Sequence, residues 1–237
     1  MNDLISKIHK VDWSLVEESL HAKGFALVPN LLTPKECDGL KVMYNHPSGY
    51  RKTVVMERYR FGLGEYKYFD YPLPNMIQTL REAIYPHLVP VANLWMKALK
   101  MEKIFPDTHQ ELMEQCKEQN QLKPTPLILK YGEGGFNTLH QDLYGDVYFP
   151  LQAVLFLSEP GEDHEGGEFV LTQQTPRAQS KAMVLRPKKG SMVVFTTNFR
   201  PVKGQKGYYR VAVKHGVSEV SEGERYTLGI IFHDAIS

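Results

Sequence analysis

The stretch Leu127-Ile-Leu-Lys-Tyr-Gly-Glu-Gly-Gly-Phe-Asn-Thr-Leu-His-Gln-Asp142 opens the part of the chain that decides the fold. It begins with an apolar run typical of a buried strand and passes through a glycine-rich turn. From here to the C-terminus, short apolar runs alternate with turns that contain Gly or Pro. Short strands at this spacing favour an antiparallel sandwich or barrel over a sheet of βαβ units. The strands predicted here are 127–131, 151–158, 168–172, 182–186, 191–196, 209–213 and 225–232.

Residues 1–124 carry mostly helix signals. Asp12 and Gly24 are typical of the two caps of a helix over 12–24, and Thr33 with Glu36 forms a capping box that starts a second helix. The other elements predicted here are a strand over 25–28, short strands within the aromatic segment 50–74, and helices over 75–103 (kinked by prolines) and 107–121.

Composition limits the class of protein. The chain has 237 residues, of which 42% are hydrophobic and 23% charged, which is ordinary for a globular protein and excludes a disordered tail, a collagen or a coiled coil. The apolar run 153–157 is far shorter than the ~20 residues that span a bilayer, so no membrane partner is expected. Cys37 and Cys116 are too few for a disulfide framework and no secretion signal is visible, so we predict a cytoplasmic protein with reduced thiols.

The basic residues are unevenly distributed, although the formal net charge is only +1. No Asp or Glu occurs from Phe169 to Ser218, and ten of the 28 basic residues lie between Arg177 and Lys214. Such a stretch is typical of a surface that meets a phosphate-rich partner. The alternative is that alternating strands scatter these charges over several faces.

A metal site is predicted from three residues. His140 and Asp142 are two positions apart in extended chain, so their side chains point to the same face. His215 follows the strand predicted over 209–213 and supplies a third ligand. Two histidines and one carboxylate are the facial ligand set of non-heme Fe(II) oxygenases, which leaves positions open for a cosubstrate and for O₂.

Arg225 and Thr227 predict the cosubstrate. They open the last strand and share a face, so a guanidinium lies beside a hydroxyl. This pair is suited to the distal carboxylate of a dicarboxylate such as 2-oxoglutarate. The alternative for Arg225 is a cation on a strand surface.

These motifs together resemble the Fe(II)/2-oxoglutarate-dependent oxygenases. Within them, Tyr131, Leu139-His-Gln-Asp142, His215-Gly216 and Arg225-Tyr-Thr-Leu228 resemble the AlkB-type nucleic-acid demethylases, and Gly166-Gly-Glu168 is similar to a turn of the prolyl hydroxylases. The chain looks most like a bacterial group assigned to oxidative repair of damaged nucleic acid. The resemblance implies a double-stranded β-helix (jelly-roll) core, and the whole prediction is an α+β fold. We expect one domain over 1–237, with helix-rich residues 1–124 as a buttress and 125–237 as the catalytic core.

The resemblance also implies roles for individual residues. Fe(II) is expected at His140, Asp142 and His215, and 2-oxoglutarate at Arg225, with Tyr131 donating a hydrogen bond and Thr227 assisting. The predicted activity is hydroxylation of a C–H bond with Fe(II), 2-oxoglutarate and O₂.

The substrate stays open at the level of sequence. Oxidative demethylation of alkylated nucleic acid is the first hypothesis, with Tyr66, Tyr68 and Arg210 as candidate substrate residues. The spacing from His215 to Arg225 is closer to that of prolyl hydroxylases, so hydroxylation of a peptidyl proline or lysine, or of a free amino acid, is an alternative. A second alternative is a non-catalytic binding module on the same fold. The sequence predicts neither the oligomeric state nor the role of residues 50–120.

Overall fold

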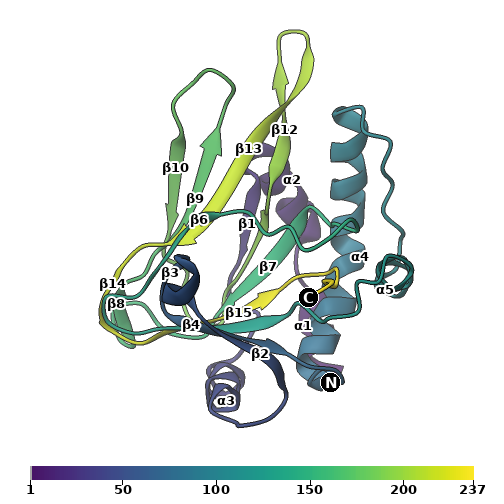
Figure 1. Ribbon diagram of the computed structural model, residues 1–237. Helices are drawn as coiled ribbons and strands as arrows, with labels where there is room; N and C mark the ends of the chain where they lie inside the picture. Colours follow the sequence, from purple (N-terminus) through teal and green to yellow (C-terminus); the bar gives the residue numbers. More distant parts are fainter. Residues whose placement is uncertain (1) are drawn as a thin grey trace.

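Two antiparallel sheets face each other and helices cover one of them (Figure 1). The computed structural model describes residues 2–237. The helices are α1 (Asn2–His9), α2 (Trp13–Lys23), α3 (Pro34–Tyr44), α4 (Asn75–Ala98) and α5 (His109–Glu118), with a short 3₁₀ helix, η1 (Met56–Tyr59).

The larger sheet has seven strands. In spatial order they are β1 (Phe25–Val28), β11 (Met192–Thr196), β7 (Leu151–Phe156), β15 (Arg225–Ile230), β5 (Leu127–Tyr131), β4 (Glu65–Phe69) and β2 (Tyr50–Val55). The second sheet contains β10 (Lys181–Leu185), β9 (Phe169–Gln174), β13 (Gly207–Val217), β6 (Phe136–His140) and β3 (Gly62–Leu63), and β12 (Phe199–Gly204) pairs with β13. A small sheet joins β8 (His164–Gly166) to β14 (Val220–Gly223).

Strand β7 shows why the sequences of the central strands are continuous apolar runs. Its residues Leu151, Ala153 and Leu155 pack in the cluster shared with the helices. Its residues Val154 and Phe156 point the other way, into the cluster between the two sheets. Because alternate side chains of a strand face opposite sides, a strand buried on both faces is apolar at its odd and at its even positions.

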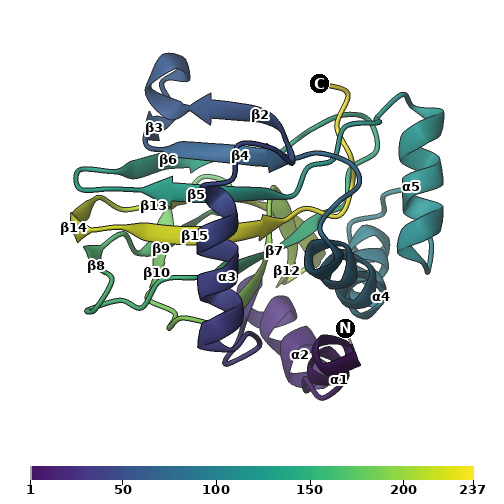
Figure 2. The same ribbon diagram turned by 90° about the horizontal axis from the view of Figure 1, so that it is seen from below.

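The helices α1, α2, α3 and α4 lie on the outer face of the larger sheet (Figure 2). The predicted caps are confirmed: the Asp12 side chain accepts from the Leu15 N–H, and Gly24 ends α2 in the left-handed conformation (φ 82°). Thr33 and Glu36 form the predicted capping box of α3.

Helix α4 runs through Pro86 and Pro90 and ends at Ala98, earlier than the predicted residue 103. Both prolines lie on its exposed side, where the carbonyls that lose a hydrogen bond are open to solvent. Among residues 2–237, we find no helix with the length and hydropathy needed to cross a bilayer.

Several parts of the fold differ from the sequence prediction. Strands β6, β8 and β14 lie outside the predicted strands. Helix α1 was not predicted. Strand β1 and short strands within 50–74 were predicted, but residues 1–124 were expected to form a helix-rich buttress, and strands β1 to β4 instead extend both sheets. Residues 199–204, which lie outside the predicted strands, form strand β12. This strand pairs only with β13, and an edge position tolerates Pro201, which has no N–H to donate.

Candidate active site

The two candidate metal histidines are brought together by strand register. His140 ends β6 and His215 lies in β13, and their Cα positions are direct partners in the antiparallel pairing. Directly opposite residues share a face, so the two rings meet with centroids 4.2 Å apart. Asp142 follows on the same side, and the three ligand atoms lie within 4.8 Å of one another.

A bulge in β6 turns a further residue toward the same cavity. Between the partners His215↔His140 and Val217↔Asn137, two residues of β6 oppose one of β13. This shift resets the alternation, so Asn137 and His140 both line the cavity. Gly216 permits the close approach, because a Cβ there would lie 2.7 Å from the Asn137 carbonyl oxygen. The His-Gly pair of the sequence therefore has a structural reason.

The Asp142 carboxylate is held by neighbours from other elements. Gln152 Nε2 donates to its Oδ2 over 2.9 Å, and the Tyr144 hydroxyl donates to its Oδ1 over 3.0 Å. Burial opposes ionisation, but the His215 and His140 imidazoles and the Gln152 amide outweigh it and hold the pKa of Asp142 well below its usual range. The carboxylate is therefore ionised, as a metal ligand must be.

The imidazole of His140 is also prepared to bind a metal. Its Nδ1 donates to the Thr138 carbonyl over 2.7 Å, which leaves the lone pair on Nε2. Burial and the neighbouring His215 lower the pKa of His140, so the ring is neutral at pH 7. The Nε2 atom of His140 lies 3.6 Å from Oδ1 of Asp142, and the Nε2 atom of His215 lies 3.3 Å from Oδ2 of Asp142. Ligands about 2.1 Å from one ion at right angles lie about 3 Å apart, so the three side chains fit a single metal.

Arg225 lies across the same cavity, in β15, and is only 2% exposed. Neither Nη1 nor Nη2 has a hydrogen-bond partner among the described residues. Its guanidinium carbon lies 5.5 Å from the ring centroids of Tyr131 and of Phe156. Burial lowers the pKa of Arg225 to about 10, and nearby Tyr131 and Glu168 offset this only in part. Buried charges are normally paired, so this cation is built for an anion that the chain does not supply.

The other predicted cosubstrate residues surround this guanidinium. Tyr131 is Arg225's direct partner across β5 and β15, is fully buried, and accepts from Asn137 Nδ2 over 3.3 Å. Thr227 also lines the cavity. Gly167 packs against Arg225, since a Cβ there would lie 2.7 Å from the arginine Cδ. The cavity measures about 270 Å³, which suits a small dicarboxylate with the reacting end of a substrate.

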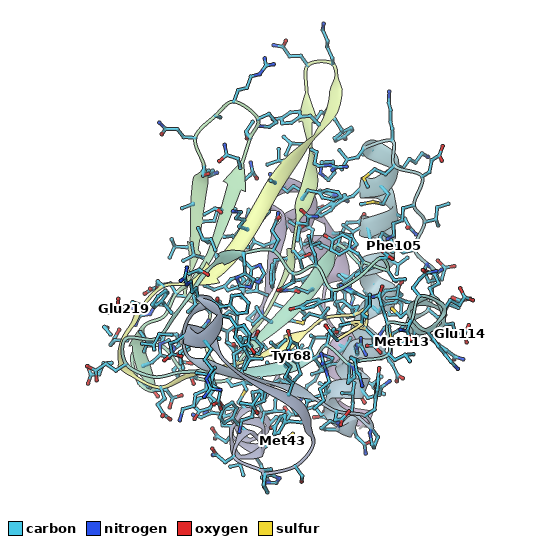
Figure 3. All side chains as sticks on the ribbon, in the orientation of Figure 1. Met43, Tyr68, Phe105, Met113, Glu114 and Glu219 are labelled. Atoms are coloured by element: carbon cyan, nitrogen blue, oxygen red, sulfur yellow. The ribbon has the colours of Figure 1, made fainter. Side chains whose placement is uncertain are left out.

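The candidate substrate residues are not all at the cavity. Tyr66 and Tyr68 line it, and their rings meet edge to face at 5.4 Å. Figure 3 shows Tyr68 near the middle of the molecule. Arg210 does not line the cavity: its exposed guanidinium stacks over Phe199 at 4.4 Å.

Several cavity residues escaped the sequence analysis, namely Asn137, Tyr144 and Gln152. Asn137 and Tyr144 are close to His140 in the chain, but only the bulge and the following loop reveal where they point. Gln152 is a polar residue inside the apolar run 151–157, and that interruption was the available signal.

A carboxylate and two imidazoles that leave half of a metal's coordination open, opposite a desolvated cation, define a non-heme iron dioxygenase that uses 2-oxoglutarate. Comparison with known families agrees. The model of the Oxygenase-NA family, described as "Oxygenase, catalysing oxidative methylation of damaged DNA", matches residues 64–235. The chain belongs to this family.

Two relatives and two solved structures are also similar to this chain. Two uncharacterized proteins from strains of Mycobacterium tuberculosis are 45% identical over 167 residues, covering 70% of this chain and 72% of theirs. A Pseudomonas putida prolyl-4-hydroxylase has a similar fold, with a TM-score of 0.55 at 17% identity over 92% of this chain and 96% of its own. An oxidoreductase of the 2OG-Fe(II) oxygenase family from Burkholderia pseudomallei reaches a TM-score of 0.55 at 12% identity, over 95% and 93%.

Proposed function

We propose that this dioxygenase removes methyl groups from alkylated bases in nucleic acid. The observation that carries its chemistry is the unpaired Arg225 guanidinium facing His140, Asp142 and His215 across one cavity. The nucleic-acid substrate is supported by the family description. Oxidation of an N-methyl group with O₂ and 2-oxoglutarate yields the free base, formaldehyde, succinate and CO₂, so the reaction is a demethylation.

We assign the following roles to the chain's own residues. Fe(II), held by His140, Asp142 and His215, supplies the oxidising chemistry. Arg225 pairs with the distal carboxylate of 2-oxoglutarate through its two free nitrogens, and a fork-to-carboxylate geometry fixes the cosubstrate's orientation. Tyr131 and Thr227 line the same cavity, and we assign their hydroxyls hydrogen bonds to that carboxylate.

The apolar residues between the sheets exclude water from this cavity. Val154, Phe169 and Phe195 line it and belong to the inter-sheet cluster. This apolar, water-free side of the cavity strengthens the Arg225–carboxylate pair, because the attraction between charges grows as the local dielectric constant falls.

We further propose that the two facing sheets form a double-stranded β-helix, or jelly roll, within one domain over 1–237. The one-domain proposal is supported by a single hydrophobic cluster that joins α1 through α5 to β7, β11 and β15. We place the protein in the cytoplasm, where the buried free thiols of Cys37 and Cys116 stay reduced.

Tyr66, Tyr68 and Phe61 support a base as the substrate. All three line the cavity, and Phe61 is 44% exposed. A flipped or unpaired base stacks on such side chains without regard to its sequence context. A proline or lysine side chain of a peptide is the competing substrate, and the turnover test below separates the two.

The cofactor roles are tested by anaerobic titration. Fe(II) with 2-oxoglutarate should give a weak visible charge-transfer band in the wild-type protein. The band should disappear in His140→Ala and persist in His46→Ala, since His46 follows α3 on the helix-covered side and does not line the cavity. A missing wild-type band, or a band that survives in His140→Ala, would contradict the assignment.

The substrate is tested by turnover. Succinate and formaldehyde should be released in equal amounts with methylated oligonucleotides, and neither should rise with proline-rich peptides or free amino acids. Succinate release stimulated by a peptide, without formaldehyde, would replace this proposal with a hydroxylase.

A further inference from the structure

Two hairpins extend from one end of the second sheet. Strands β9 and β13 pair along Phe169–Gln174 and Ala212–Val217. Beyond Gln174, β9 turns through 175–180 into β10, while the outer part of β13 pairs with β12. Figure 1 shows both hairpins projecting past the body of the molecule at the same end. We call the hairpins β9–β10 and β12–β13 the two arms.

The arms carry basic side chains that have no acidic partner. Six residues of the basic stretch are exposed on the arms or at their root, and none takes part in an ion pair among residues 2–237: Arg177, Lys181, Lys203, Lys206, Arg210 and Lys214. Long side chains reach from both arm tips into open space (Figure 3).

The basic residues nearer the body of the molecule differ from those on the arms in their ion pairs and burial. Arg186 pairs with Glu165 over 2.7 Å, and Lys189 pairs with Asp38 over 2.6 Å. Arg200 is buried, at 7% exposed. Of the four basic residues near the body, the fold therefore pairs two and buries one, and Lys188 is exposed without an ion pair in the described part of the chain. The arms carry only positive charges, because no acidic residue occurs from 169 to 218.

Aromatic rings accompany these cations. Tyr208 and Tyr209 on β13 are 53% and 37% exposed, and they lie between Lys206 and Arg210 in the chain. Exposed rings interleaved with cations are the pattern of a surface that stacks bases and tracks a phosphate backbone. An acidic peptide would use the charges but has no need of the rings.

The arms are connected to the metal site by one strand. β13 runs from the arm tip at Gly207 to the ligand His215, eight residues further on. At about 3.3 Å per residue this is about 26 Å, a distance that a nucleic acid strand rising 3.4 Å per nucleotide covers in about eight nucleotides.

We propose that the two arms hold the phosphate backbone of a single-stranded nucleic acid whose base, within about eight nucleotides, enters the cavity. This inference rests on the proposed function, since it assigns the surface that presents the substrate to the iron site. Each arm contributes phosphate contacts without base specificity.

Salt dependence tests the proposal on the full chain. An unmodified, fluorescently labelled 12-nucleotide single strand is titrated by anisotropy at 50 and 200 mM salt. For single strands the log–log slope is about −0.7 per phosphate contact. Four arm contacts therefore predict an affinity loss of roughly 50-fold between the two salt concentrations. A flat titration would overturn the proposal.

A matched pair of double variants locates the contacts. Lys203→Gln/Lys206→Gln removes two arm charges and should reduce the salt effect to roughly 7-fold. Lys35→Gln/Lys117→Gln removes two exposed charges from α3 and α5 and should keep the wild-type value. Equal effects of both double variants would place the contacts elsewhere and overturn the proposal. Arg177→Gln/Lys181→Gln repeats the test on the other arm.

Oligonucleotide length and ligand class complete the test. A three-nucleotide strand should bind at least tenfold more weakly than the 12-nucleotide strand, and a polyglutamate peptide of equal charge should not compete. Equal affinity for polyglutamate would overturn the assignment to nucleic acid. The charge-transfer band of Fe(II) with 2-oxoglutarate separates the two proposals. A band without salt-dependent binding of the oligonucleotide would refute only the role of the arms. Salt-dependent binding without a band would refute only the oxygenase site.

Discussion

Replacing Arg225 with methionine should stabilise the protein against unfolding and at the same time greatly weaken 2-oxoglutarate binding. The pKa of Arg225 falls from 12.5 to about 10, mainly through burial. A base whose pKa is lower in the folded than in the unfolded state destabilises the fold at every pH below that lowered pKa, so removing it restores the lost stability. A shift of about 2.5 units corresponds to about 3 kcal/mol.

The substitution should raise the stability of the fold and lower the affinity for 2-oxoglutarate, and the size of each effect follows from a different interaction. Methionine loses the packing over Tyr131 and Phe156, so we expect a net gain of about 1–3 kcal/mol, or a Tm rise of roughly 2–10 °C for a chain of this size. Breaking the buried pair with the cosubstrate should cost about 3–5 kcal/mol. The Kd for 2-oxoglutarate then rises roughly 100- to 4000-fold.

The assay is thermal unfolding of the metal-bound protein with and without 2-oxoglutarate, together with calorimetric titration of the cosubstrate. Arg200→Met is the matched control: this arginine is also buried, but it donates to Gln173 Oε1 and to the His21 carbonyl, each over 3.0 Å. The control should lose about 1–3 kcal/mol of stability and bind 2-oxoglutarate normally. If Arg225→Met melts below wild type and still binds the cosubstrate, the reasoning fails.

Three further outcomes are expected. Gln152→Leu removes the amide that holds Asp142 and should weaken Fe(II) binding roughly 10- to 100-fold in an anaerobic titration, whereas an unchanged affinity would show that the carboxylate needs no such support. Gly167→Ala places a methyl group 2.7 Å from the Arg225 Cδ at φ +68°; it should raise the KM for 2-oxoglutarate with little change in Fe(II) affinity, and an equal loss of both would point to general misfolding. Burial lowers the pKa of His109 to about 3, below its unfolded value of 6.5. The unfolded state therefore binds an extra proton between pH 6.5 and 3, and unfolding free energy should fall with decreasing pH in that window by up to about 1.4 kcal/mol per unit for this residue. Denaturation of His109→Leu across the same window should show a shallower dependence, and an unchanged one would refute the assignment.

The strands that the sequence predicts most clearly are those at the centre of the larger sheet. Strands such as β7 and β11 are buried on both faces, so their apolar runs stand out from the turns. Strand β6 is partly exposed along its length and carries no such pattern, and β12 contains a proline and a lysine at a sheet edge. The hydrophobic pattern of the sequence does not reveal a strand that is stabilised by pairing with its neighbours and not by burial of its own side chains.

The candidate site is predictable from sequence only where ligand spacing is local. His140 and Asp142 are two residues apart, and an extended chain is enough to place them on one face. The convergence of His215 depends on its register against β6, and no local pattern specifies that register. The bulge that turns Asn137 inward is likewise a property of the pair of strands.

The two halves of the cavity differ in how complete they are without ligands. The carboxylate of Asp142 has donors on both oxygens, so the metal side is preorganised by the chain. Nη1 and Nη2 of Arg225 have no acceptor among the described residues, so the fold bears the cost of a desolvated cation until an anion binds. A ligand that binds only the folded state stabilises it by mass action, and here it also relieves this cost. Cosubstrate binding is thus coupled to the stability of β15 and its neighbours β5 and β7. The same logic applies at the far end of β13, where unpaired cations on the arms are neutralised only by an external polyanion. In both places the chain leaves a charge uncompensated where its ligand is to bind.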